Sequence, residues 1–517
     1  MSELKALPLG IQDFEKIITN DFLYIDKTTY IHQMVKKGGL YFLSRPRRFG
    51  KSVLINTLQA LYQGRRELFE GLYIADKWDW QPRPIIRLDF LGVKTGKGML
   101  EQEINDRLDE QAAIYGVKLE APDSNRRFRQ LILELSKQGR VVVLIDEYDK
   151  PILDQISNQE QAEANRKLLA TFYAVLKSLE HHLEFLLMTG VSKFSKVSLF
   201  SDLNNLTDIT LHPTYGRITG YTQQELDHYF SPYLEDGIGG LCGEPLRNKI
   251  KDWYNGYSWD GKTRVYNPVS VLQLLYQHKF DVFWFATGTP RFLIELLRQK
   301  RIDIKNLPGM EVNSMFMEGY EPDAIDPVAM LFQTGYLTIK EIIYAEENDE
   351  LDTYQMDYPN FEVRRSFLNH LLADYAEQAP SFIGPMVQKL KRDLGKNKID
   401  AFCQGLQGLF ATIPYNAFVP EREGYYQTVI YLILSLLGLE PACEVQTNKG
   451  RVDAVLETSN CFYVVEFKIG SALEAIDQIK EREYAAAYAH RSKPVKLLGI
   501  GIDPLQKNIH EWICENN

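Results

Sequence analysis

One short run limits the fold of this 517-residue chain more than any other feature of the sequence. Five apolar residues, Val141 to Ile145, are followed directly by the carboxylates Asp146 and Glu147. A strand that is apolar on both faces is typical of a parallel sheet covered by helices on both sides. In open sheets of this type, ligands bind at the carboxyl ends of the strands. The run therefore predicts an α/β fold with a polar site where this strand ends.

Strand-like and helix-like runs alternate over the first part of the chain. The spacing of apolar residues predicts helices over 51–62 and 130–136. Short β-branched or aromatic runs predict strands at 39–43, 84–90 and 183–189. Strands that alternate with helices in this way favour a doubly wound α/β domain.

The segment between the first strand and the first of these helices has the composition of a phosphate-binding loop. Residues 44–52 read SRPRRFGKS, with Arg45 at the first glycine position of the usual GxxxxGK[ST] pattern. Glycine lets the backbone approach phosphate, Lys51 reaches the β- and γ-phosphates, and Ser52 joins the shell of a Mg2+ ion. A chance GKS at a helix start is the alternative. The candidate nucleotide-binding residues are Arg47, Arg48, Phe49, Gly50, Lys51, Ser52, Val53, Asp146 and Thr189.

The two carboxylates after the apolar run complete this candidate site. Asp146 would hold Mg2+, through water, and Glu147 would polarise the water that attacks the γ-phosphate. A strand that ends in a solvated acidic turn is the alternative, but it does not explain both motifs in this order. The sequence therefore predicts ATP and Mg2+ as cofactors. Thr189 and Ser192, at the end of the next strand, are sensors of the γ-phosphate or members of a plain turn.

Basic residues leave two further alternatives open. Arg45, Arg47 and Arg48 are contacts to phosphate or to a partner subunit, or they are solvated charges. Arg291, which opens a later helix, is a lid residue that touches nucleotide or an exposed surface arginine.

The pattern of residues changes at about position 222. Helical, aromatic-rich segments follow and predict a mostly helical lid or winged-helix region, and the acidic stretch 346–350 is expected to be a hairpin tip or a linker. The predicted domains are an ATPase core at 1–221, the lid at 222–345, a helical linker at 346–415 and a second, small α/β domain at 416–517.

A second group of charged residues lies near the C-terminus. Residues 452–456 and 462–467 have the pattern of neighbouring strands that form a hairpin. Side chains two positions apart share one face of a strand, so Glu466 and Lys468 point the same way. Asp453 on the paired strand can converge on them, which gathers two carboxylates and one ammonium at one point.

This arrangement fits a metal-dependent nuclease. Asp453 and Glu466 offer hard oxygen ligands to Mg2+ or Mn2+, and Glu444 is a candidate third ligand. Lys468 would orient the attacking water or stabilise developing negative charge. The alternative is a surface hairpin with an exposed salt bridge, but charges inside an apolar run are costly unless they are paired or metal-bound. Gln478, on the following helix, contacts phosphate or metal-bound water, or is an ordinary surface glutamine.

Charge, cysteines and hydropathy exclude several classes of protein. The net charge of -10 argues against an extended nucleic-acid surface, although it permits a local basic groove. The five cysteines are scattered without zinc-binding spacing, which argues against structural zinc and for a reducing compartment. The chain starts without the pattern of a signal peptide, and no apolar run approaches the roughly 20 residues of a membrane span. We therefore expect a cytoplasmic protein without membrane contact.

Together, these motifs resemble a known bacterial architecture. The front end is similar to the predicted AAA-ATPase-like family, in which the arginine-rich loop is itself typical. The residues that carry this similarity are 24–28 (YIDKT), 45–52 (RPRRFGKS), 146–149 (DEYD), 189–192 (TGVS) and 203–208 (LNNLTD). The back end resembles the PD-(D/E)XK nuclease superfamily through 450–453 (GRVD), 466–468 (EFK) and 478–479 (QI), with Val452 in place of the signature proline.

The resemblance implies an AAA-like P-loop ATPase coupled to cleavage of nucleic acid, with DNA as the expected substrate. It also implies a role in mobile-element control or in defence against foreign DNA. In AAA-type assemblies an arginine of a neighbouring copy completes the site, so a homo-oligomer is expected, and its order is left open. The alternatives are a regulatory ATPase whose C-terminal domain binds nucleic acid or a partner without cutting, and a scaffold with both sites inert.

Overall fold

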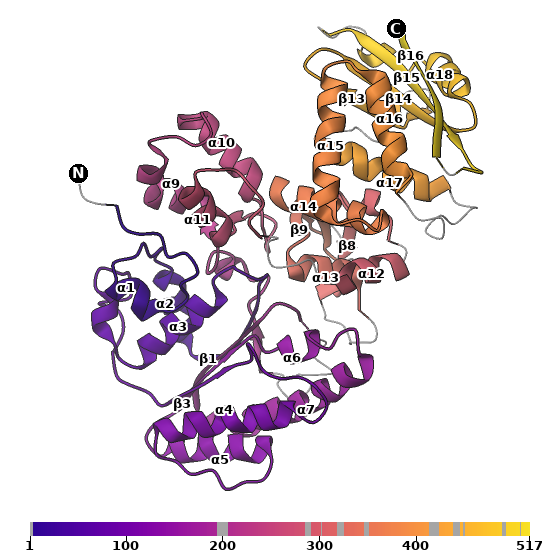
Figure 1. Ribbon diagram of the computed structural model, residues 1–517. Helices are drawn as coiled ribbons and strands as arrows, with labels where there is room; N and C mark the ends of the chain where they lie inside the picture. Colours follow the sequence, from indigo (N-terminus) through magenta and orange to yellow (C-terminus); the bar gives the residue numbers. More distant parts are fainter. Residues whose placement is uncertain are drawn as a thin grey trace. The chain divides into compact units, whose positions relative to one another are not determined.

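The chain forms two compact units in the computed structural model (Figure 1). The first comprises Met1–Ile302 and Asn306–Arg364, and the second comprises Asp303–Lys305 and Arg365–Asn517. The domain boundaries predicted at 221, 345 and 415 stay predictions. The structure describes residues 4–193, 205–284, 291–300, 302–317, 325–345, 351–412, 423–437, 445–447, 450–488, 493–506 and 508–517.

A five-stranded sheet organises the first unit. Its strand order is β2-β3-β4-β1-β5, and every neighbouring pair is parallel. All residues of β3, which lies between β2 and β4, are buried, as the apolar run predicts. The strands are β1 (Gly39–Ser44), β2 (Ile85–Asp89), β3 (Val141–Asp146), β4 (Leu183–Gly190) and β5 (Thr207–Asp208).

Helices cover both faces of this sheet, which confirms the predicted doubly wound α/β fold (Figure 1). One face carries α1 (Phe14–Thr19), α2 (Thr28–Lys37) and α3 (Lys51–Tyr62). The other carries α4 (Leu100–Ile114), α5 (Ser124–Ser136) and α7 (Gln159–Ser178), and the short α6 (Lys150–Leu153) follows β3.

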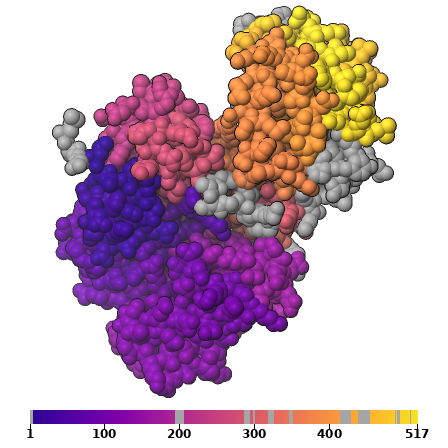
Figure 2. All heavy atoms as spheres, in the orientation of Figure 1, coloured from indigo at the N-terminus to yellow at the C-terminus, as the bar shows by residue number. Residues whose placement is uncertain are grey.

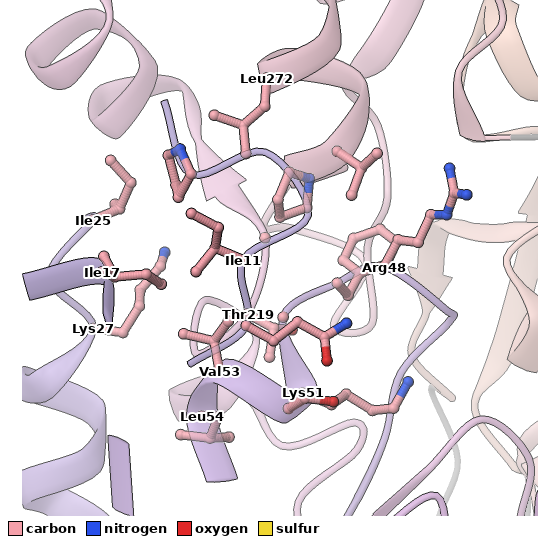
Figure 3. Close-up of a pocket in the computed structure, with 18 of the residues that line it drawn as sticks. Ile11, Ile17, Ile25, Lys27, Arg48, Lys51, Val53, Leu54, Thr219 and Leu272 are labelled. Atoms are coloured by element: carbon pink, nitrogen blue, oxygen red, sulfur yellow. The ribbon is translucent and has the colours of Figure 1, made fainter. Parts of the chain in front are cut away.

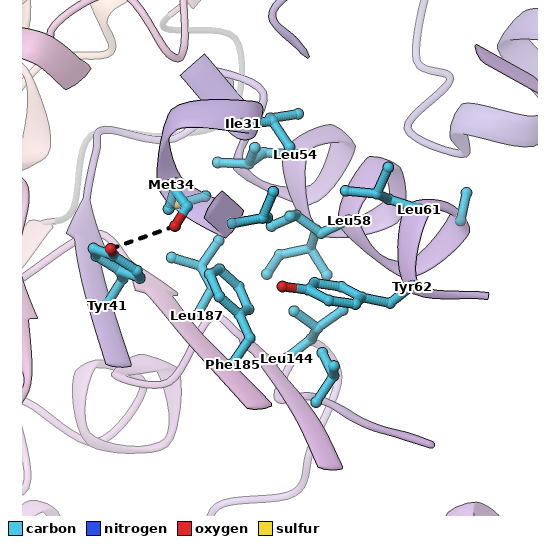
Figure 4. Packing of buried hydrophobic residues seen from close by; sticks show 14 of the residues in the cluster. Ile31, Met34, Tyr41, Leu54, Leu58, Leu61, Tyr62, Leu144, Phe185 and Leu187 are labelled. Atoms are coloured by element: carbon cyan, nitrogen blue, oxygen red, sulfur yellow. Dashed lines mark hydrogen bonds between the residues drawn. The ribbon is translucent and has the colours of Figure 1, made fainter. Parts of the chain in front are cut away.

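The core between α2, α3 and the sheet positions the start of α3. Leu58 and Leu61 of α3 are fully buried and face Leu144 and Leu187 of the sheet (Figure 4). Burying a leucine side chain stabilises a fold by roughly 1.5–3 kcal/mol, so this row of contacts fixes the helix firmly. The loop before α3 is therefore held at the carboxyl edge of the sheet.

A mostly helical region follows the sheet within the first unit, as predicted. Its first part has a core of its own, which also takes in Ile25 and the partly buried Leu7 and Leu9 of the N-terminal segment. The elements of this part are β6 (Tyr221–Thr222), α9 (Gln223–Tyr229), α10 (Gly243–Tyr254), β7 (Val265–Tyr266) and α11 (Pro268–Gln277). The N-terminal segment thus packs against the helical region.

The rest of this region contains a small antiparallel sheet that the sequence patterns did not reveal. It has the order β8-β10-β9. The stretch 346–350, expected to be a hairpin tip or a linker, lies outside the described residues and between the paired strands β9 and β10. The elements are α12 (Arg291–Gln299), β8 (Glu311–Asn313), α13 (Pro327–Thr334), β9 (Thr338–Ile343) and β10 (Thr353–Asp357).

The second unit joins helices to a four-stranded mixed sheet, and its side chains form one packed mass in Figure 2 (orange to yellow). The sheet order is β13-β14-β15-β16, and β14 and β15 are parallel neighbours connected through α18. The helices are α14 (Phe361–Tyr375, which begins in the first unit), α15 (Pro380–Gly395), α16 (Ile399–Phe410), α17 (Glu423–Leu436) and α18 (Ala472–Glu481). The strands are β11 (Val445–Thr447), β12 (Gly450–Val452), β13 (Ala454–Glu457), β14 (Phe462–Ile469), β15 (Val495–Asp503) and β16 (Asn508–Asn516).

One detail of the predicted hairpin is wrong. The expected continuous strand over 452–456 is broken at Asp453, which forms a bend between β12 and β13. The two strands pair with different partners, β12 with β11 and β13 with β14. The break frees the Asp453 side chain from strict strand alternation.

Among the helices that the structure describes, none is both long enough and apolar enough to span a membrane.

Candidate functional site

The loop between β1 and α3 has the backbone geometry of an anion-binding turn. Gly50 is the N-cap residue of α3 and has φ +89°, a left-handed conformation that glycine adopts without strain. Arg48 is also left-handed, with φ +69°, which a non-glycine residue adopts only at a cost. The first backbone N–H groups of α3 have no partner within the helix and point toward the loop.

Lys51 lies under this loop, with its side chain 4% exposed. Its Nζ donates to the carbonyl oxygens of Arg45 (3.1 Å) and Pro46 (3.3 Å). The same ammonium lies 3.7 Å from Oε1 of Glu147 at the end of β3. The structure thus brings together the lysine and the carboxylate that the sequence assigned to one site.

The carboxylates at the end of the sheet form a chain of contacts. The hydroxyl of Thr189 donates to Oδ1 of the buried Asp146 (2.6 Å), and the backbone N–H of Glu147 donates to the same oxygen (3.1 Å). Asp89 ends β2 in register with Asp146, and burial, together with the charge of Asp146, raises its pKa. Sequence reasoning missed Asp89, although its place at the end of a predicted strand carried the signal.

Asp149 is a second carboxylate near this site, which entered the sequence analysis only as part of the 146–149 run, without an assigned role. It is completely buried, and its Oδ2 accepts from the backbone N–H of Val191 (3.0 Å) and from the N–H and hydroxyl of Ser192 (both 2.6 Å). Burial, and then the neighbouring charge of Glu147, raises the pKa of Asp149 to about 6. Thr189 therefore binds the last residue of β3, Asp146, and Ser192 binds Asp149 just beyond it, which ties the end of β4 to the end of β3.

A cavity of about 240 Å³ adjoins the loop (Figure 3). Its walls are mainly apolar and include Ile11 of the N-terminal segment, Ile25 and Leu272 of α11. Loop and helix residues close one side: Arg48, Phe49, Gly50, Lys51, Ser52, Val53 and Leu54. The cavity is open to the same loop that would hold phosphate, so a ligand with an apolar body and an anionic tail fits it.

Lys27 lies in the wall of this cavity and links it to the helical region. Its Nζ donates to both carboxylate oxygens of Glu225, at 2.6 and 2.7 Å. Glu225 also completes a capping box with Thr222 at the start of α9. The pair joins residues far apart in the chain across one side of the cavity.

The loop arginines have three different environments. Arg45 is fully buried, donates to the carbonyls of Ser44, Thr210 and Tyr215, and stacks on Trp259 at 4.0 Å. Of the expected roles for Arg45, a contact to phosphate or to a partner subunit or a solvated charge, its complete burial excludes the solvated charge, and its two terminal nitrogens donate to carbonyls of the same chain. Arg47 is exposed, and Arg48 donates to the carbonyl oxygen of Phe283 (2.9 Å). The side chain of Arg291 lies outside the described residues.

The C-terminal carboxylates meet where β13 and β14 pair. Ala454 is in register with Val465, which places Asp453 opposite Glu466. The backbone N–H of Asp453 donates to Oε2 of Glu466 (3.2 Å), and the N–H of Phe467 donates to Oδ2 of Asp453 (2.9 Å). Gln478 of α18 donates to Oε1 of Glu466. The predicted convergence of these side chains is therefore present.

The surroundings of Glu466 change the pKa of its carboxyl group. Burial, and then the charge of Asp453, raises the pKa of Glu466 to about 8, while Lys468 opposes the rise. Glu466 is only 3% exposed. Glu444, the candidate third ligand, lies outside the described residues.

A divalent cation suits this donor set. The two carboxylates are hard oxygen ligands of the kind that Mg2+ and Mn2+ prefer, and a bound cation would offset the cost of a buried charge. Among the described residues, no group of three or more His, Cys, Asp or Glu side chains is placed to hold a metal ion. Asp453 and Glu466 would therefore hold it together with water and ligands from elsewhere.

These geometries define a class: an ATPase-type nucleotide-binding sheet followed by a small nuclease-type sheet. The family described as "Predicted AAA-ATPase" matches residues 8–200, and the "PD-(D/E)XK nuclease superfamily" matches residues 421–512. An Azotobacter chroococcum mcd 1 protein, described as "Uncharacterized protein in vnfD 5'region", is 37% identical over 524 residues, 99% of each chain. The chain belongs to this family of predicted AAA-ATPases with a C-terminal PD-(D/E)XK domain.

Proposed function

We propose that the protein binds and hydrolyses ATP with Mg2+ and that its C-terminal domain cleaves nucleic acid, DNA in the first place, with Mg2+ or Mn2+. The buried carboxylate of Glu466 beside the partly buried Asp453 supports the cleavage half most strongly, because a buried carboxylate next to a second acidic side chain is costly unless it serves a cation. A role in mobile-element control or in defence stays a prediction, and so does association into homo-oligomers.

In the ATPase half, the cavity would receive the nucleoside and the loop the triphosphate. Lys51 would exchange its carbonyl partners for phosphate oxygens, and its departure would release Glu147 to orient the attacking water. Ser52 and Asp146 would hold the Mg2+ ion, which neutralises charge on the phosphates when bound. Thr189 keeps the Asp146 carboxylate in place through its hydroxyl.

In the nuclease half, Asp453 and Glu466 would bind the cation, which supplies Lewis acidity to the scissile phosphate. Gln478 fixes one oxygen of Glu466 and leaves the other facing Asp453. Lys468 lies two residues beyond Glu466 on β14, on the same face, where its ammonium would orient the water or stabilise developing charge.

A second candidate function is regulatory. In this candidate the C-terminal domain binds nucleic acid or a partner without cutting, and it is favoured by the hydrogen bonds that both oxygens of Glu466 already accept, from Gln478 and from the backbone N–H of Asp453.

The two candidates are separated by one assay. Full-length wild-type protein is incubated with duplex DNA, single-stranded DNA or RNA in the presence of Mg2+ or Mn2+. Two variants are assayed in parallel: Asp453→Asn, and the control Asp477→Asn, which changes an exposed carboxylate on α18. Cleavage by the wild type and the control, but not by Asp453→Asn, supports the nuclease. No cleavage of any substrate, with binding retained, supports the regulatory candidate.

A further inference from the structure

The arginine-rich loop is embedded in the helical region of the first unit. Arg45 stacks on Trp259, and Phe49 contacts Tyr257 and Trp259 edge-on, at 4.7 and 5.4 Å between ring centroids. A side chain at Gly335 would come within 2.9 Å of Pro46, so the loop and this region are in close contact. The loop conformation is therefore set by residues far away in the sequence.

One buried carboxylate organises the part of this contact that involves Arg48. Glu362, in the first turn of α14, is 0% exposed. Its Oε1 accepts from the backbone N–H groups of Phe283 (2.5 Å) and Trp284 (2.7 Å), and its Oε2 accepts from the hydroxyl of Ser270 on α11 (2.7 Å). The carboxylate thus fixes the backbone at 283–284.

That backbone in turn holds the phosphate loop at two points. Arg48 donates to the carbonyl oxygen of Phe283 (2.9 Å), and the indole N–H of Trp284 donates to the carbonyl oxygen of Arg47 (3.4 Å). The strained backbone of Arg48, with φ +69°, needs such outside support. The positive charge of Arg48 also acts on the Glu362 carboxylate itself.

We propose that Glu362 is a positioning residue for the phosphate-binding loop and that it acts through Phe283, Trp284 and Arg48. The guanidinium of Arg48 is used to hold the loop, and not to contact phosphate. Because Glu362 lies in the first turn of α14, which continues into the second unit, the loop is linked to the start of the helix that joins the two units. The proposal rests on ATP binding at the loop.

The test is a double-mutant cycle on the full-length chain, with Kd for Mg-ATP as the readout. Arg48→Met and Glu362→Ala are each expected to weaken binding about tenfold, which is ~1.4 kcal/mol. The double variant is expected to be no weaker than about tenfold, because both changes remove the same link. Glu362→Gln is expected to bind like the wild type, since its amide oxygen can still accept from both backbone N–H groups.

Losses that multiply to about a hundredfold, or a loss confined to Arg48→Met, would overturn the proposal and make Arg48 a direct phosphate contact. Arg126→Met, an exposed arginine on α5, is the matched control and should bind normally. If Glu362→Ala fails to fold, Ser270→Ala replaces it in the cycle, because it removes the hydroxyl that donates to Oε2 of Glu362 and so loosens the same link. Absence of Mg-ATP binding by the wild type would refute the proposed ATPase instead.

Discussion

Glu362→Gln should change the pH dependence of stability in a way that can be calculated. Burial raises the pKa of this carboxyl from 4.5 to about 7, against the opposing effects of its hydrogen bonds and of Arg48. The folded state therefore holds a proton at pH values where the unfolded state has lost it. Stability is not affected below about pH 4.5, falls as pH rises toward 7, and stays lower above it.

The size of the effect follows from the shift. A difference of about 2.5 pKa units, at ~1.4 kcal/mol each, lowers the free energy of unfolding by roughly 3 kcal/mol above pH 7. Glutamine can keep all three hydrogen bonds, with its oxygen on the two backbone N–H groups and its N–H on Ser270. It carries no charge, so the variant should lack this dependence on pH.

The assay is urea unfolding of nucleotide-free protein at pH 5 and pH 8.5, followed by tryptophan fluorescence. Five of the six tryptophans lie before residue 285, so the signal reports mainly on the first unit. The variant should exceed the stability of the wild type only slightly at pH 5, where the loss has just begun, and by roughly 3 kcal/mol at pH 8.5. The groups that interact electrostatically with Glu362 are Arg48, Tyr254 and Tyr257. Neither tyrosine ionises between pH 5 and pH 8.5, because burial raises the pKa of both. An equal difference at both pH values would refute the reasoning.

Three further outcomes are expected. Lys51→Ala should abolish detectable Mg-ATP binding in equilibrium titration, because the ammonium is assigned to phosphate, and it should also lower the unfolding midpoint, because the carbonyls of Arg45 and Pro46 lose their donor. Arg45→Met should lower the free energy of unfolding by at least ~3 kcal/mol in urea titration, because three carbonyls and the Trp259 ring lose a buried cation. Mn2+ should raise the melting temperature of the second unit, monitored through Trp512, in the wild type but not in Asp453→Asn. EDTA should stop cleavage. A shift of the melting temperature in both proteins would argue against this metal site.

Local patterns were enough to predict the elements that carry the sites. The apolar run before Asp146 is a fully buried strand, and the helix predicted from Lys51 begins at that residue. The C-terminal carboxylates converge because strand alternation and hairpin pairing are local properties of the sequence. Asp89 could also have been predicted, because it ends a predicted strand and parallel strands end at the same edge of a sheet, beside Asp146.

Contacts between distant segments could not be predicted in the same way. Nothing near Arg45 in the sequence indicates that Trp259 would cover it, and nothing near Arg48 points to Glu362. The bend at Asp453 was hidden because β12 and β13 follow each other in one apparently continuous run and differ only in their pairing partners. The small sheet of β8, β9 and β10 is partly exposed, so it lacks the apolar pattern of a buried strand.

The arginine-rich loop shows how a phosphate-binding turn can keep its shape without the first glycine. The left-handed positions of the loop are Arg48 and Gly50, so the backbone at position 45 does not require glycine. Arginine needs an external acceptor set, and burial of its charge is costly unless that set is complete. The carbonyls of Ser44, Thr210 and Tyr215 accept from its two terminal nitrogens and the ring of Trp259 stacks on it, whereas its buried Nε has no hydrogen-bond partner among the described residues. Of these groups Trp259 belongs to the helical region, so that region helps to set the conformation of the loop.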